Sequence, residues 1–172
     1  GYDAVVDYLT DSTLTDDQRD GLLTFVEDGG GYVGIHCAAD LTSTVADDPA
    51  ELIDSREEPF PALRDLIGGH FLTHPEQSIV DVRIVDHHSP ITATLDDVSV
   101  WDEPYVVEVD DDVRVLARMD HPEHADVPVA WTKPYGDGRV FYCSLGHGIA
   151  SLTDDGVQAL LRNGTRWAAG DE

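Results

Sequence analysis

Apolar and polar positions along the first forty residues follow the periods of strands and helices. The apolar run Tyr2–Leu9 predicts a strand, and Gly31–Ile35 predicts a second one. The segment between them carries apolar residues at helical spacing and opens with a capping box, in which Thr15 caps the helix and Gln18 reaches back. Gly29 follows as the C-terminal cap. The order strand, helix, strand predicts a βαβ unit and hence parallel pairing.

The remainder of the chain predicts further strands and two more helices. Residues 41–58 are polar and acidic and predict a long surface loop, and residues 60–67 predict a short helix. Further strands are predicted over Ser78–Val85, Tyr105–Val109, Val113–Met119, Val127–Thr132 and Arg139–Ser144. Asp137-Gly138 predicts a hairpin turn between the last two, and Gly156–Ala169 predicts a C-terminal helix. We therefore expect an α/β domain with a mostly parallel sheet, helices on both faces and an antiparallel extension around 105–135.

Charge is the strongest global signal in the composition. The chain has 35 acidic and 10 basic residues, a formal net charge of −25. The acidic residues are spread between periodic apolar segments, which argues against acidic disorder. Such a surface repels itself unless salt screens it, so we expect a protein adapted to the high-salt cytoplasm of a halophile. The same field disfavours nucleic acid and anionic membranes as partners. No apolar run is long enough to span a bilayer, and no signal peptide is recognisable at the N-terminus.

The stretch GGGYVGIHCAAD, residues 29–40, matches the dinucleotide fingerprint G-x-G-x-x-G as a string. In a dinucleotide site the glycines follow a strand and open a helix, so that backbone N–H groups meet the pyrophosphate. Here they end a helix and precede a strand. We therefore expect no nucleotide cofactor.

The end of the same stretch predicts a sharp turn with His36 at its apex. Gly34 and Ala38 place small residues two positions before and after His36, as a tight strand-to-helix turn requires. The apex side chain then projects from the carboxyl end of the sheet, where α/β proteins bind ligands. A buried structural histidine is the alternative interpretation. Cys37 lies one position late for a nucleophile, and both Cys37 and Cys143 are expected to be reduced core thiols.

An ordered set of motifs resembles a known family. GGGYVGIHCAAD, GGHFLTHP (68–75), WDEPY (101–105), VPVAW (127–131) and GRVFYCSLGH (138–147) are similar to the motifs of ThuA-like proteins, named for trehalose utilisation. The resemblance implies a single domain over 1–172 with a flavodoxin-like, class I glutamine amidotransferase-like three-layer sandwich. It also implies a role in carbohydrate metabolism, with His36 at the position of the amidotransferases' catalytic cysteine.

Two features of the chain bear on what the resemblance implies. Chains of this family usually begin with a strand and a helix upstream of the equivalent of Tyr2–Leu9, so the sequence is short at its N-terminus. A sheet edge exposed there could be covered by a partner chain, which makes a homo-oligomer an expectation. GGHFLTHP is expected to be a loop, in which the family comparison favours His74, the His-Pro histidine, over His70.

Two more segments supply candidate site residues. Glu103 in WDEPY lies among aromatic residues, and an apolar setting would raise its pKa towards acid–base use. Trp101 and Tyr105 could stack on a sugar ring, although core packing is the commoner role of such residues. His147 follows a predicted strand, where it could act as a base or a ligand. The other histidines lie in acidic loops and are expected to be solvated.

These observations lead to a first hypothesis and two alternatives. The first is an enzyme, such as a hydrolase or isomerase, that acts on a small-molecule carbohydrate. Its candidate catalytic residues are His36, Glu103 and His147, and its candidate substrate-binding residues are Cys37, His74, Trp101 and Tyr105. His36, His74 and His147 could hold a divalent metal such as zinc, or the set could do metal-free acid–base work. The alternatives are a Cys37-dependent amidotransferase or hydrolase using His147, and a non-catalytic sugar-binding or assembly module.

Overall fold

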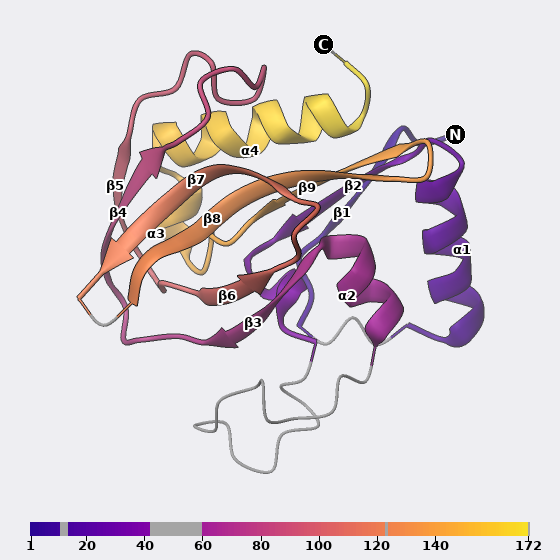
Figure 1. Cartoon of the computed structure of the whole chain (residues 1–172), viewed down its shortest axis with the longest axis horizontal. Helices are drawn as coiled ribbons and strands as arrows, with labels where there is room; N and C mark the ends of the chain where they lie inside the picture. Colours follow the sequence, from indigo (N-terminus) through magenta and orange to yellow (C-terminus); the bar gives the residue numbers. More distant parts are fainter. Residues whose placement is uncertain (11–13, 42–59, 123, 172) are drawn as a thin grey trace.

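A computed structural model describes residues 1–10, 14–41, 60–122 and 124–171 of the chain. Its larger sheet has seven strands in the order β1-β2-β9-β8-β7-β4-β5 (Figure 1). Their bounds are β1 Ala4–Asp7, β2 Gly31–Ile35, β4 Ser78–Ile84, β5 Val98–Asp102, β7 Arg114–His121, β8 His124–Tyr135 and β9 Gly138–Cys143. A second sheet pairs β3 (Gly69–Thr73) with β6 (Val106–Val109). The helices are α1 Asp16–Glu27, η1 His36–Ala39 (a 3₁₀ turn), α2 Pro61–Ile67, α3 Ile149–Leu152 and α4 Asp155–Ala168.

Parallel pairing is confined to one end of the large sheet. β2 pairs in parallel with β1, as the βαβ unit predicts, and it also pairs in parallel with β9. The pairings of β9 with β8, β8 with β7, β7 with β4 and β4 with β5 are all antiparallel. The fold is therefore a mixed α/β fold, and the expected predominance of parallel strands holds only for β1, β2 and β9. Short connections, such as the hairpin through Asp137, explain the difference, because two residues can join only antiparallel neighbours.

The helices and the small sheet lie on both sides of the large sheet. α4 packs against β9 and β2 on one side, whereas α2 and the β3–β6 sheet lie on the other (Figure 1). The buried interior is centred on β8 and β9, where the rings of Trp131 and Tyr142 stack with centroids 4.2 Å apart. The indole N–H of Trp131 donates to the carbonyl oxygen of Ile67, 2.8 Å away. This bond satisfies a polar group that would otherwise be costly to bury.

Local signals in the sequence produce the first helix as expected. The side chain of Thr15 accepts from the backbone N–H of Gln18, whose side chain accepts from the N–H of Thr15. After the helix ends, Gly29 has φ of +108°, a conformation that favours glycine. Both the capping box and the terminating glycine are therefore confirmed.

Other expectations are corrected. The segment GGHFLTHP is not all loop, because Gly69–Thr73 forms β3, and neither β5 nor α3 was expected. The strand predicted over Tyr2–Leu9 is shorter, Ala4–Asp7. Apart from Leu41, the loop predicted over 41–58 lies outside the described residues. Among the helices that the structure describes, none combines the length and the apolar composition needed to cross a bilayer.

Candidate active site

The candidate site begins at the turn that follows β2. His36 has φ of +47°, an uncommon value for a residue other than glycine, which agrees with the sharp apex predicted from the sequence. The glycine two positions before His36 is required by space, since a Cβ at Gly34 would lie 2.9 Å from Cδ2 of Tyr142 and 3.2 Å from Cε1 of Tyr32. The hydroxyl of Tyr142 donates to the carbonyl oxygen of His36, 2.6 Å away. The apex is therefore held in a strained conformation by its surroundings.

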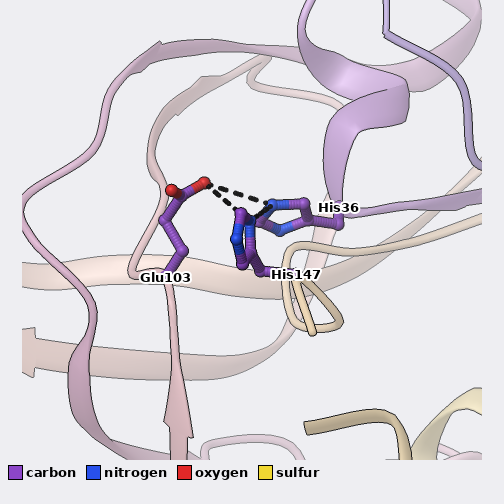
Figure 2. A group of neighbouring side chains, drawn as sticks. All are labelled: His36, Glu103 and His147. Carbon is purple, nitrogen blue, oxygen red and sulfur yellow. Dashed lines mark hydrogen bonds and ion pairs between the residues drawn. The ribbon is translucent and has the colours of Figure 1, made fainter. Parts of the chain in front are cut away.

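The imidazole of His36 is buried and fixed at both ends. It is 3% exposed, and its Nδ1 lies 2.7 Å from the carbonyl oxygen of Ser144. Because a carbonyl only accepts, Nδ1 donates to the oxygen of Ser144, and Nε2 faces away from it. The ring of Tyr105 packs on it with centroids 3.9 Å apart. Figure 2 shows that Nε2 points towards Glu103 and His147.

Glu103 follows β5, and its carboxylate lies between three imidazoles. Oε2 lies 3.3 Å from Nε2 of His36 and 3.2 Å from Nδ1 of His147 (Figure 2). Oε1 lies 3.4 Å from Nδ1 of His74. Burial raises the pKa of the Glu103 carboxyl, but the hydrogen bond to His36 and the charges of the imidazoles outweigh burial and hold the pKa below its ordinary value. The sequence predicted a raised pKa from the aromatic neighbours. The direction is wrong because the imidazoles, rather than the aromatic rings, surround the carboxylate.

His147 follows β9 and is the most accessible member of the group formed by His36, Glu103 and His147. Its side chain is 39% exposed, and its Nδ1 lies 3.3 Å from Nε2 of His36. Its other ring nitrogen, Nε2, lies 3.0 Å from the side-chain amide nitrogen of Gln77. One oxygen of Glu103 and one nitrogen of each histidine thus lie within reach of a single metal ion or a single shared proton.

Asp102, at the end of β5, joins the two segments that carry Glu103 and His147. Its carboxylate is 2% exposed and accepts three backbone hydrogen bonds. Oδ1 accepts from the N–H of Glu103 and the N–H of His147, each at 3.0 Å, and Oδ2 accepts from the N–H of Gly146 at 2.7 Å. These bonds connect the end of β5, the edge strand of the large sheet, to the turn that follows β9, although the two strands are not neighbours in the sheet. Sequence reasoning missed this role, although Asp102 belongs to the WDEPY motif.

The other predicted residues take different positions. His74 is exposed and touches Oε1 of Glu103, so it lies beside the group and not within it. Tyr105 is 5% exposed and packs between His36 and Phe71, which makes it a wall of the site with little surface for a ligand. Trp101 points outward from β5 and is 51% exposed. His70, which was set aside in favour of His74, lies in β3 near Glu108.

A cavity of about 360 Å³ adjoins His147. Its lining consists of Gln77, Trp101, Asp102, His147, Gly148, Ile149 and Ala150. The volume is within the range of small-molecule sites, which starts at about 300 Å³. Gln77 was not singled out in the sequence, because nothing local to it indicates that its side chain meets a histidine seventy residues later.

Cys37 lies outside the group of His36, Glu103 and His147. Burial raises the pKa of its thiol, and a hydrogen bond with Thr10 offsets this effect only in part. The protonated thiol is a poor nucleophile. Cys37 and Cys143 are both free thiols, and burial raises the pKa of Cys143 to about 12. Cys143 is a buried free thiol, as expected, whereas Cys37 is free but only half-buried.

Fold and site together define a mixed α/β protein with a histidine–carboxylate group at the carboxyl ends of β2, β5 and β9. The family model described as "ThuA: Trehalose utilisation" matches residues 1–168. The chain therefore belongs to the ThuA family, as its motifs indicated. A comparison with curated proteins finds no match.

Several solved structures share this fold. A ThuA-like protein from Bacteroides uniformis is 25% identical, with a TM-score of 0.75 over 97% of this chain and 69% of its own. A ThuA-like protein from Parabacteroides merdae is 18% identical, with a TM-score of 0.79 over 98% of this chain and 70% of its own. A β-galactosidase from Rahnella sp. R3 is 17% identical, with a TM-score of 0.65 over 94% of this chain and 22% of its own.

Proposed function

We propose that this chain is an enzyme that transforms a sugar or a sugar derivative by acid–base chemistry at His36, Glu103 and His147. The observation that carries the proposal is the convergence of these three side chains beside a cavity of ligand size. The family's description, trehalose utilisation, favours a carbohydrate as the ligand.

Glu103 and His147 divide the proton-transfer roles in this proposal. The lowered pKa of Glu103 keeps the carboxylate ionised near neutral pH, so it can take up a proton that His147 removes from a hydroxyl of the ligand or from a carbon beside a carbonyl. His147 is the only one of the three that lines the cavity, so its imidazole is suited to carry protons to and from the ligand. The buried His36, fixed by Ser144, orients the other two.

The cavity supplies surfaces suited to a sugar ring. The indole of Trp101 offers an exposed aromatic face for the C–H side of a pyranose. The side-chain amide of Gln77 can hydrogen-bond hydroxyl groups, and Ile149, 76% exposed, offers a second apolar surface. This mixture of one aromatic face, one aliphatic face and a few polar groups is typical of small-molecule sites.

The test is proton NMR of a sugar panel incubated with the protein in deuterated buffer containing molar KCl. The panel includes trehalose, its component monosaccharide and keto derivatives of both. Hydrolysis appears as new anomeric signals, and proton abstraction appears as loss of a C–H signal. We expect turnover of at least one member, reduced about 100-fold or more in His147→Gln. The variant His88→Gln is the matched control, because that side chain is 96% exposed and lies outside the site.

Three outcomes would contradict the proposal. Equal turnover by wild type and His147→Gln would remove the proposed role of that histidine. Binding of a sugar without any turnover would favour the non-catalytic binding module. Loss of turnover in Cys37→Ser as well as in His147→Gln would favour the thiol-dependent alternative, which uses both residues.

A further inference from the structure

The three converging atoms of the site form a nearly equilateral triangle. Nε2 of His36 lies 3.3 Å from Oε2 of Glu103, Oε2 lies 3.2 Å from Nδ1 of His147, and the two nitrogens are 3.3 Å apart. A tetrahedral zinc ion holds nitrogen and oxygen ligands at about 2.0–2.1 Å, which places neighbouring ligand atoms about 3.3–3.4 Å apart. Figure 2 shows all three atoms facing one point.

We infer that His36, Glu103 and His147 form a divalent-metal site suited to zinc, with Gln77 as the residue that sets the tautomer of His147. The inference rests on the proposed function and deepens it by naming a cofactor for the same three residues. With the ion bound, these residues would hold it, and the bound ion would replace their direct proton transfer. Two histidines and one carboxylate, with a fourth position open, are a ligand set used by catalytic zinc. The ion would polarise a carbonyl or hydroxyl oxygen of the ligand.

The residues behind the triangle are those that a metal site needs. A histidine ligand donates its other ring N–H to an acceptor, which fixes the ring and leaves the ligating nitrogen free. His36 meets this requirement, because its Nδ1 is held by the carbonyl oxygen of Ser144 at 2.7 Å. Oε1 of Glu103, which faces away from the triangle, is approached by Nδ1 of His74 at 3.4 Å. His74, expected to be a ligand, thus supports a ligand instead.

His147 can take two tautomers, and Gln77 distinguishes them. The amide nitrogen of Gln77 faces Nε2 of His147 at 3.0 Å, so Nε2 accepts and the proton lies on Nδ1, directed at Glu103 and His36. This is the form suited to a site that holds a proton. If the amide turns over, its oxygen accepts from Nε2–H, and the lone pair of Nδ1 enters the triangle. This second form is the one that binds a metal.

Zinc binding to metal-stripped protein tests the site. The measurement is competition with a coloured chelator in molar KCl, which screens the non-specific attraction of cations to the acidic surface. We expect one tight equivalent in wild type and in His88→Gln. We expect affinity reduced about 100-fold or more in Glu103→Gln and in His147→Gln. Two ligand variants are used because Glu103 is largely buried, whereas His147 is 39% exposed and its substitution leaves the core intact.

Two substitutions at the exposed Gln77 test the tautomer argument. Gln77→Glu provides only acceptor oxygens and should bind zinc at least as tightly as wild type, whereas Gln77→Leu should bind about 10-fold more weakly. Gln158→Glu adds the same charge on the exposed side of α4 and should leave the affinity unchanged. If Gln77→Glu and Gln158→Glu tighten binding equally, general charge explains the effect and the role of Gln77 is wrong.

The metal inference and the proposed function fail separately. Zinc binding is measured without any sugar, so a protein that binds zinc tightly but transforms no sugar contradicts only the proposed function. Sugar turnover that is lost in His147→Gln but needs no metal contradicts only the metal site. Equal zinc affinity in wild type and both ligand variants overturns the inference, as does a zinc-soaked crystal with no anomalous signal between the three atoms.

Discussion

The substitution Asp102→Asn should destabilise the protein more than its small size suggests. The carboxylate is 2% exposed and accepts from three backbone N–H groups, two at Oδ1 and one at Oδ2. An amide in the same place keeps one acceptor oxygen and sets an NH₂ group against the third N–H, that of Gly146. The substitution therefore removes a charge-assisted hydrogen bond, leaves a buried donor without an acceptor and weakens the other two bonds.

The magnitude follows from these three bonds. A hydrogen bond to a charged group contributes about 1.5–3 kcal/mol, and a neutral one contributes about 0.5–1.5 kcal/mol. Relief from burying the charge offsets part of the loss. We expect the free energy of unfolding to fall by about 2–4 kcal/mol, which lowers the melting temperature by about 4–16 °C for a chain of this size. The assay is urea unfolding at fixed KCl, followed by tryptophan fluorescence.

Asp111→Asn is the matched control for this experiment. Asp111 is exposed, so its substitution makes the same chemical change and removes the same charge from a strongly acidic protein. If Asp102→Asn unfolds within about 0.5 kcal/mol of Asp111→Asn, the buried carboxylate does not hold the turn after β9 and the reasoning is refuted. Loss of His147-dependent turnover should accompany the destabilisation, because Asp102 also binds the backbone N–H of His147.

Four further outcomes follow from the structure. Gly34→Ala should lower the free energy of unfolding by about 1–3 kcal/mol, because the new methyl group would contact a buried ring. Gly148→Ala should leave it nearly unchanged, because a Cβ there meets nothing within 4 Å. Equal losses in the two variants would contradict the requirement for glycine before the apex at His36. A hydrogen bond from Arg114 lowers the pKa of Asp86, so the ionised carboxylate stabilises the folded state. Above pH 4, the free energy of unfolding of the wild type should therefore exceed that of Asp86→Asn by about 1 kcal/mol. That difference should vanish as the pH falls through the lowered pKa, and a constant difference down to pH 2 would refute it. Cys37→Ser should keep turnover, and iodoacetamide should label the folded thiol slowly at pH 7. The melting temperature should rise steeply with KCl because of the net charge of −25, and indifference to salt would contradict the halophilic reading.

Interactions between residues close in sequence could be predicted, and they are the ones the structure confirms. The capping box of Thr15 and Gln18 depends on two positions three residues apart, and the apex at His36 depends on small neighbours two residues away. Strand positions followed from the alternation of apolar residues, except for β3 and β5. β3 lies in a segment whose glycines and proline indicated a loop.

Pairing between distant strands could not be predicted in the same way. The expectation of a mostly parallel sheet extended the pattern of the first βαβ unit to the whole chain, whereas the pairings from β9 to β5 are antiparallel. The large sheet brings the end of β5, at one edge, back to the turn that follows β9. No local pattern carries this information, because it depends on how the whole sheet packs.

The sequence by itself indicated the family, the sharp turn with His36 at its apex and the candidates Glu103 and His147. The ordered motifs indicate the family by resemblance, whereas the apex is predicted by small residues two positions before and after His36. Only the tertiary structure decided that Oε2 of Glu103 lies beside both His36 and His147. It also decided that Oε1 of Glu103 lies beside His74, and that Asp102 and Gln77 hydrogen-bond His147. The physical reason is that side chains from three strand ends converge only after strand order, register and packing have been fixed together.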